Sequence, residues 1–161
     1  MIDDRIMTNK KKLTKVDRFK YEIIVNEWHP EILFNDAMYQ SVLDDREFEE
    51  RISIIMIGNL KSTTSKKCKK VVASTITLSP NDNWYNRDMI REDLHTIGYM
   101  NLERADTEIY QEDTICFWVS IPTKSFELIK HFVSYSGKGR FTIMGTDLSY
   151  RKGDIYSLRF E

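Results

Sequence analysis

Apolar and polar residues alternate along several short segments of the chain, and this alternation predicts β-strands that bury one face. An aromatic or aliphatic residue occupies every second position from 19 to 25, so residues 19–28 are predicted to form the first strand. Two segments rich in β-branched residues, 51–60 and 69–80, predict the next two strands, and the second stops at Pro80.

The second half of the chain predicts two further strand pairs. Strands over 99–110 and 113–121 are expected to pair through a turn, and a C-terminal hairpin is expected to turn around Gly153. Apolar residues fall on both faces of 113–121, which indicates a central strand. One face carries Ile115, Phe117, Val119 and Ile121, and the other carries Cys116 and Trp118.

Three segments predict helices, because they lack internal glycine and proline and show helical spacing of apolar residues. The predicted helices cover residues 36–49, 86–98 and 124–136. Gly98 and Gly137 supply stop signals for the second and third of them. His29 and Pro30 are expected to form a turn between the first strand and the first helix.

Strands and helices are interspersed, yet most strand connections are too short for helical crossovers. We therefore expect a single α+β domain over residues 18–161, with a mostly antiparallel sheet and about three packed helices. Residues 1–17 are polar and basic, so a flexible N-terminal arm is expected. No signal peptide or bilayer-spanning run is evident, which predicts a cytoplasmic protein without membrane contact; the oligomeric state stays open.

The net charge of −1 conceals a pattern of charged blocks. Residues 21–60 carry nine acidic and two basic side chains, and residues 71–120 carry nine acidic and three basic ones. Between these acidic blocks lies KSTTSKKCKK, residues 61–70, which contains five lysines and no acid. Because strands are predicted on both sides of it, this lysine segment is predicted to be the exposed link of an antiparallel hairpin.

The acidic blocks favour a non-enzymatic binding protein, such as an inhibitor or immunity-type protein that neutralises a basic protein partner, for example a toxin. Aromatic residues beside the carboxylates would anchor that partner. An ordinary solvated acidic surface explains the same charges without a partner. The predicted partner-binding residues are Asp88, Glu92, His95, Trp84, Tyr85, Asp44, Asp45 and Glu49.

The alternative hypothesis is association with nucleic acid, in which phosphates contact the lysine segment and the N-terminal arm. The predicted contact residues are Lys66, Lys67, Lys69 and Lys70. Two observations oppose it: the isoelectric point is near 6.3, and no aromatic residue is interleaved with these lysines to stack a base. A solvated loop is the simpler interpretation of the segment.

Catalytic motifs for phosphate loops, metalloproteases, thiol redox centres and nucleophile elbows are missing from the sequence. An enzyme with an unrecognised carboxylate site is therefore only a third hypothesis. Asp88, Glu92 and His95 share one predicted helical face, but a solvated face accounts for them without a ligand, so no metal and no cofactor are predicted. Cys68 is expected to have a lowered thiol pKa if its neighbouring lysines stay close, Cys116 is expected to be buried, and no disulfide is predicted.

Overall fold

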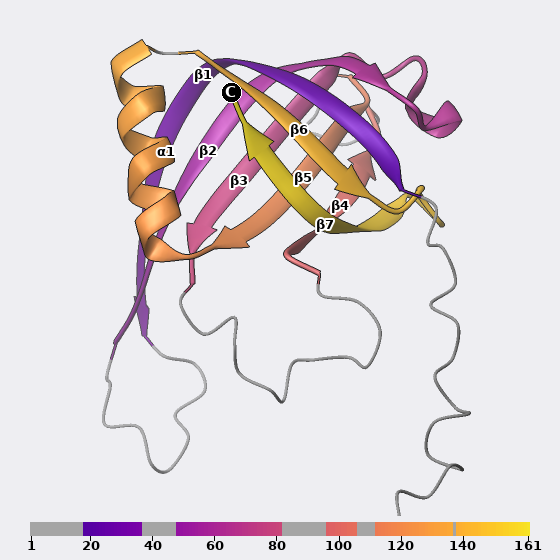
Figure 1. The fold of residues 1–161 in the computed structure, drawn as a ribbon. Coiled ribbons are helices and arrows are strands. Elements are labelled where there is room, and N and C mark those ends of the chain that lie inside the picture. The colour runs from indigo at the N-terminus through magenta and orange to yellow at the C-terminus, as the bar shows by residue number, and fades with distance from the viewer. Residues whose placement is uncertain (1–17, 37–47, 82–95, 106–111, 137) are drawn as a thin grey trace, which may run out of the picture.

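The computed structural model describes residues 18–36, 48–81, 96–105, 112–136 and 138–161, and for 33–36 and 48–51 it describes the backbone alone. Seven strands in these ranges close into a barrel (Figure 1). The strands are β1 (Phe19–Asp36), β2 (Phe48–Thr63), β3 (Ala73–Pro80), β4 (Gly98–Glu103), β5 (Thr114–Ile121), β6 (Gly139–Gly145) and β7 (Lys152–Phe160). The described residues also form one α-helix, α1 (Thr123–Ser136), and one short 3-10 helix, η1 (Lys66–Cys68).

Around the barrel the strands follow the order β1-β2-β3-β5-β4-β7-β6, and β6 pairs with β1 to close the sheet. Neighbouring strands are antiparallel except β3 and β5, which are parallel. The connection between β3 and β4 is long enough for β4 to return on the far side of β5. The hairpin of β6 and β7 then lies between β4 and β1 and completes the barrel.

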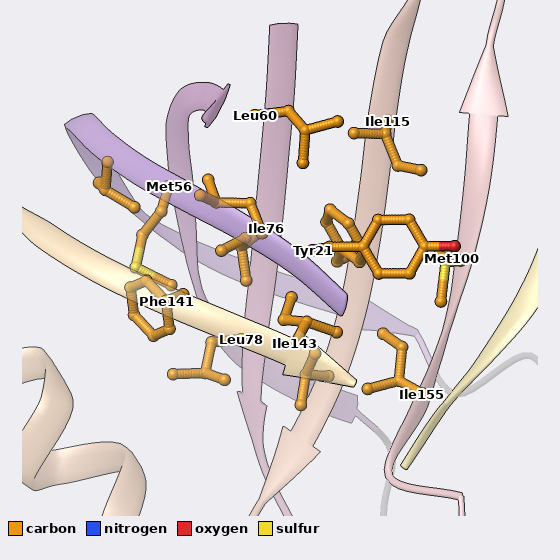
Figure 2. Close-up of a cluster of buried hydrophobic side chains, with 14 of the residues drawn as sticks. Tyr21, Met56, Leu60, Ile76, Leu78, Met100, Ile115, Phe141, Ile143 and Ile155 are labelled. Carbon is orange, nitrogen blue, oxygen red and sulfur yellow. The ribbon is translucent and has the colours of Figure 1, made fainter. Parts of the chain in front are cut away.

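Inward-facing side chains from every strand fill the barrel, as is typical of a small barrel with a packed interior. Figure 2 shows labelled residues of all seven strands converging on one apolar cluster. Within it, Tyr21 of β1 meets Phe117 of β5 edge to face, with ring centroids 5.6 Å apart. The largest fully buried side chains are Tyr21, Phe117, Phe126, Phe141, Ile23, Ile54, Met56, Ile76, Leu78, Met100, Ile115 and Ile143.

The two longest strands, β1 and β2, curve around the barrel together (Figure 1). Their pairing shifts register after Glu22 and again after Val25, and bulges of this kind increase the local twist of a strand. Gly58 pairs with Val25 at this bend, and a Cβ at position 58 would stand 1.9 Å from the carbonyl oxygen of Ile24. The close approach of the two backbones therefore requires glycine at position 58.

The prediction of a helix over 124–136 is confirmed by α1. The helix lies across the end of the barrel where β5 ends and β6 begins (Figure 1), and its residues Phe126 and Val133 join the core. Leu128, Phe132 and Tyr135 are exposed on its outer face. In the part of the chain that the structure describes, no helix has the length and apolar character needed to cross a membrane.

The expected α+β class is wrong, because the sheet closes on itself rather than presenting an open face for about three helices to cover. The predicted helix over 36–49 is contradicted at both of its ends, since Asp36 is the last residue of β1 and Phe48 the first of β2. Residues 37–47 lie outside the described residues.

Three further sequence predictions differ from the structure or lie outside the residues that it describes. Most of the predicted helix over 86–98 falls in 82–95, outside the described residues, and Gly98 begins β4 instead of ending a helix. The expected turn at His29 and Pro30 is wrong, because β1 continues through both, and Pro30 pairs with Ile54 of β2. Gly153 lies inside β7 rather than at a turn, where a Cβ would press on Met100.

The remaining strand predictions are confirmed. Strands cover most of 19–28, 51–60 and 69–80, and β2 and β3 form the predicted antiparallel pair. β4 and β5 also pair antiparallel, although β4 ends at Glu103. β5 is central, with β3 on one side and β4 on the other, as its two apolar faces predict. The predicted arm over 1–17 lies outside the described residues.

Candidate functional site

The lysine segment, residues 61–70, folds back onto one end of the barrel. Its first residues extend β2 to Thr63, and the amide of Thr64 donates to the carbonyl of Lys20 at 3.0 Å. The amide of Lys20 in turn donates to the Thr64 hydroxyl at 2.8 Å. Ser65 and Cys68 are buried within the segment, so its backbone is fixed against the barrel rather than held away from it.

Asp147, in the connection between β6 and β7, holds this segment in place. The hydroxyl of Ser65 donates to its carboxylate at 2.6 Å, and the Nζ atom of Lys67 lies 3.9 Å from the same carboxylate. Lys67 also donates to the carbonyl of Leu148. We call these contacts of Ser65, Lys67, Asp147 and Leu148 the clip, because they join two loops that are more than eighty residues apart in the chain.

Four lysines of the segment are left free by this arrangement. Lys61, Lys66, Lys69 and Lys70 are exposed, and none of them makes a hydrogen bond or ion pair through its ammonium group with the residues that the structure describes. Their positions are nevertheless restricted, because the clip and the η1 turn fix the backbone between them. Exposed ammonium groups without an internal partner are available to contact phosphate.

Cys68 does not behave as its sequence neighbours suggest. The lysines on both sides point to a lowered thiol pKa, but the side chain is 1% exposed and packs into the core cluster. Burial raises the pKa of the Cys68 thiol, and the carboxylate of Asp147 adds to the effect, while a hydrogen bond with Ser65 opposes it. The expectation of a lowered thiol pKa is therefore wrong, whereas Cys116 is buried, as predicted.

The turn between β6 and β7 has a strained backbone beside the clip. Ser149 and Lys152 exchange two backbone hydrogen bonds, of 2.8 and 3.0 Å. The two residues between them, Tyr150 and Arg151, have φ angles of 49° and 67°. Hairpins of this type favour asparagine and glycine at these positions, so a tyrosine and an arginine impose strain. Tyr150 is 96% exposed, which places an aromatic ring and a guanidinium group in solvent.

A groove of about 730 Å³ runs along the outside of the barrel next to this turn. It is lined by Tyr99, Met100, Asn101, Trp118, Thr146, Asp147, Ser149, Lys152, Gly153 and Asp154. In its wall the rings of Tyr99 and Trp118 stack with centroids 4.9 Å apart and an interplanar angle of 17°. Tyr99 is 56% exposed, so the stack presents ring surface to solvent.

The pairing of β4 with its neighbours sets the order of side chains in the groove. Tyr99 is directly opposite Trp118 on β5 and Asp154 on β7. Asn101, two residues further along β4, is opposite Lys152. Alternate residues of a strand point to the same face, so these side chains form two adjacent rows across the strands. One row contains Trp118, Tyr99 and Asp154, and the other contains Asn101 and Lys152.

Hydrogen bonds connect the wall behind the groove to the core of the barrel. Tyr21, inside the barrel, donates its hydroxyl to the carbonyl of Thr146 at 3.0 Å. Burial raises the pKa of the Tyr21 hydroxyl well above its ordinary value, so the group stays protonated and remains a donor. Thr146 in turn accepts the amide of Asp154 through its side-chain oxygen at 2.9 Å. The core thus fixes the strands that carry the clip and the groove.

Most of the residues predicted to bind a protein partner lie outside the described residues. These are Asp44, Asp45, Trp84, Tyr85, Asp88, Glu92 and His95. Glu49 belongs to β2, where its backbone pairs with Asn35, so the helix expected to carry it is wrong at this position. In the ranges that the structure describes, no group of three histidine, cysteine or acidic residues is placed to hold a metal ion.

The chain matches none of the protein-family models, curated proteins or solved structures with which it was compared. Its functional interpretation therefore depends on the geometry of its own residues.

The sequence identified the lysines of this site and missed the groove beside them. Trp118 was correctly predicted to face away from Phe117, which is the one signal that pointed to the outer face of β5. Tyr99, Asp147 and Lys152 line one groove only because strands from distant parts of the chain pair, and Asp147 connects that groove to the lysine segment. The structure thus supplies aromatic rings that sequence neighbours of the lysines do not.

Proposed function

We propose that the protein binds single-stranded nucleic acid at the clip end of the barrel, with phosphates on the lysine segment and bases in the groove. The observation that carries the proposal is the position of Asp147. Its carboxylate contacts Ser65 and Lys67 of the lysine segment, and the same residue lines the groove that contains Tyr99 and Trp118. Basic and aromatic groups therefore adjoin each other on one surface.

Single strands are favoured over duplexes because their bases are free to stack. Binding proteins for single strands combine positive charge along the backbone with aromatic platforms for successive bases. Here the exposed ring of Tyr99, backed by Trp118, provides one platform, and Tyr150 provides a second on the adjacent turn. The positive φ angles of Tyr150 and Arg151 support a role for those two side chains in binding, because strained backbone often occurs at binding sites.

The charge pattern also supports this location. The whole chain has a net charge of −1, so phosphate attraction must come from a local surface. Five basic residues are exposed at the clip end of the barrel, and none of them forms an ion pair within the described residues. They are Lys66, Lys69, Lys70, Arg151 and Lys152. The acidic blocks are a reason to expect that the strand is confined to this end.

The test is a fluorescence anisotropy titration of a labelled single strand of about 10 nucleotides, at low salt, against a duplex of the same length. The expected result is tighter binding of the single strand, lost on Tyr99→Ala. Tyr135→Ala is the matched control, because Tyr135 is an exposed tyrosine on α1, across the other end of the barrel. Absence of binding at low salt, or equal binding of the duplex, would contradict the proposal.

The inhibitor or immunity-type hypothesis remains a separate prediction, because the residues chosen for it lie almost entirely outside the described ranges. An affinity capture from native lysate distinguishes the two. Recovery of a basic protein whose binding is lost on Asp88→Lys and Glu92→Lys, without nucleic acid, would favour the acidic surface instead.

A further inference from the structure

Asp154 is one of two carboxylates that line the groove; the other is Asp147, which belongs to the clip. Asp154 is exposed on β7 directly opposite Tyr99, and it lines the same groove. Its backbone is engaged with Thr146, but its carboxylate makes no hydrogen bond or ion pair with any residue that the structure describes. An unpaired carboxylate here would repel a phosphate, so a ligand in this row must present hydrogen-bond donors instead.

The neighbouring groups supply further acceptors and leave the positive charge to one side. The side-chain amide of Asn101 donates one hydrogen bond to Glu103, and its carbonyl oxygen remains available as an acceptor beside its second N–H. Lys152, opposite Asn101, contributes the ammonium group of the adjacent row. The groove therefore presents the aromatic ring of Tyr99 and the carboxylate of Asp154 in one row, and the ammonium group of Lys152 in the next.

We infer that this groove selects guanine, with Asp154 as the specificity-determining residue; the inference rests on the proposed function. Guanine presents a ring N–H and an exocyclic amino group side by side on its Watson–Crick edge. One carboxylate accepts both hydrogen bonds, as carboxylates do with other paired donors. Adenine and cytosine offer one amino group beside an acceptor, which would face Asp154 unfavourably, and uracil offers a single ring N–H between two carbonyl oxygens.

The arrangement also assigns an orientation to the bound nucleotide. The base stacks on the outer face of Tyr99, its donor edge points to Asp154, and its phosphate points toward Lys152 and the lysine segment. The Watson–Crick edge of guanine is free in a single strand and base-paired in a duplex. Recognition of this edge by Asp154 therefore explains both the selectivity for guanine and the preference for single strands.

The test uses strands that differ at one position, which carries guanine, hypoxanthine or adenine in a uridine background. Hypoxanthine retains the ring N–H of guanine and lacks the amino group. The expected order of affinity is guanine, then hypoxanthine, then adenine, with roughly tenfold between the first and last, as for a good bidentate contact.

Asp154→Asn should abolish that order and raise base-independent binding slightly, because it also removes one negative charge. Because removal of any acid raises affinity for a polyanion, Glu112→Gln is the control for charge alone; it should strengthen binding of all three strands equally. Equal affinities for the three strands in the wild-type protein would overturn the inference and leave the proposed function standing. Failure of every strand to bind at low salt would overturn both.

Discussion

The hydroxyl of Ser65 donates a 2.6 Å hydrogen bond to the carboxylate of Asp147, and this contact joins the lysine segment to the turn that borders the groove. The two residues are 82 positions apart in the chain. The bond therefore converts a basic loop and a distant hairpin into one surface. Cys68 lies three residues after Ser65 in the same segment, and its side chain is buried in the core cluster, so the bond also helps to keep this thiol covered.

Asp147→Ala is expected to expose Cys68 to thiol reagents. A hydrogen bond to a charged group contributes about 1.5 kcal/mol or more, so local opening of the segment, and with it the labelling rate of Cys68, should rise roughly tenfold. The measurement is thiol alkylation under native conditions, followed by mass spectrometry of the labelled peptides. Cys116, buried in β5, is the internal control. Equal acceleration at both cysteines would indicate global unfolding and contradict the role given to the clip.

Relief of strain in the turn of β6 and β7 should stabilise the protein at a cost to binding. Tyr150→Asn with Arg151→Gly places residues that tolerate positive φ at both positions, which is expected to raise the unfolding free energy by about 1–2 kcal/mol. The same change removes an exposed ring and a cation, so oligonucleotide affinity should fall. Denaturant titration and anisotropy measure the two effects. A stabilised variant that binds as tightly as wild type would remove this turn from the interface.

The lysine segment should determine the salt dependence of binding. Lys66, Lys69 and Lys70 can be replaced by glutamine without touching the clip, which uses Lys67. Loss of three phosphate contacts should reduce the slope of log affinity against log salt by about 2 for a single strand. The control replaces Lys124, Lys130 and Lys138. A slope that is the same in both triple variants would exclude the lysine segment as the phosphate contact.

Glu22 makes the stability of the barrel dependent on acid pH. Hydrogen bonds from Lys20 and Ser62, with Arg140 at 3.1 Å, lower the pKa of the Glu22 carboxyl to about 2. The unfolded chain takes up this proton near the ordinary glutamate pKa of about 4.3, whereas the folded chain does not. The stabilisation is therefore complete above that pKa and is lost as pH falls toward the folded value.

Glu22→Gln should flatten this part of the pH profile. Unfolding free energies from denaturant titrations at roughly pH 6 and roughly pH 3 bracket the titration of the unfolded glutamate. The wild-type protein should lose more stability between them than the variant does. The same loss in both proteins would show that Glu22 is not responsible for it.

Local patterns identified most of the strands, and they failed where the outcome depends on distant pairings. The alternation from Phe19 to Val25 and the two apolar faces of β5 follow from side-chain burial alone, so both were predictable. Closure of the barrel depends on β6 meeting β1 and on β7 meeting β4, and no local signal encodes these contacts. The α+β expectation was wrong for that reason.

The candidate site shows the same division. The lysines were evident from composition, but the aromatic residues beside them come from β4, β5 and the turn of β6 and β7. Cys68 was misjudged because sequence neighbours were taken as spatial neighbours, whereas the lysine side chains point to solvent and the thiol points to the core. When a hairpin loop folds back onto its barrel, residues that are adjacent in sequence can lie in solvent and in the core.

Photo-crosslinking of a bound single strand is the most direct test of the proposed interface. A strand that carries iodouridine is irradiated in complex with the protein of residues 1–161, and the modified peptides are mapped by mass spectrometry. The account predicts adducts at Tyr99 or Tyr150, which are the exposed rings at the clip end among the residues that the structure describes. Adducts confined to α1 or to residues 1–17, with none on β4 or the turn of β6 and β7, would contradict it.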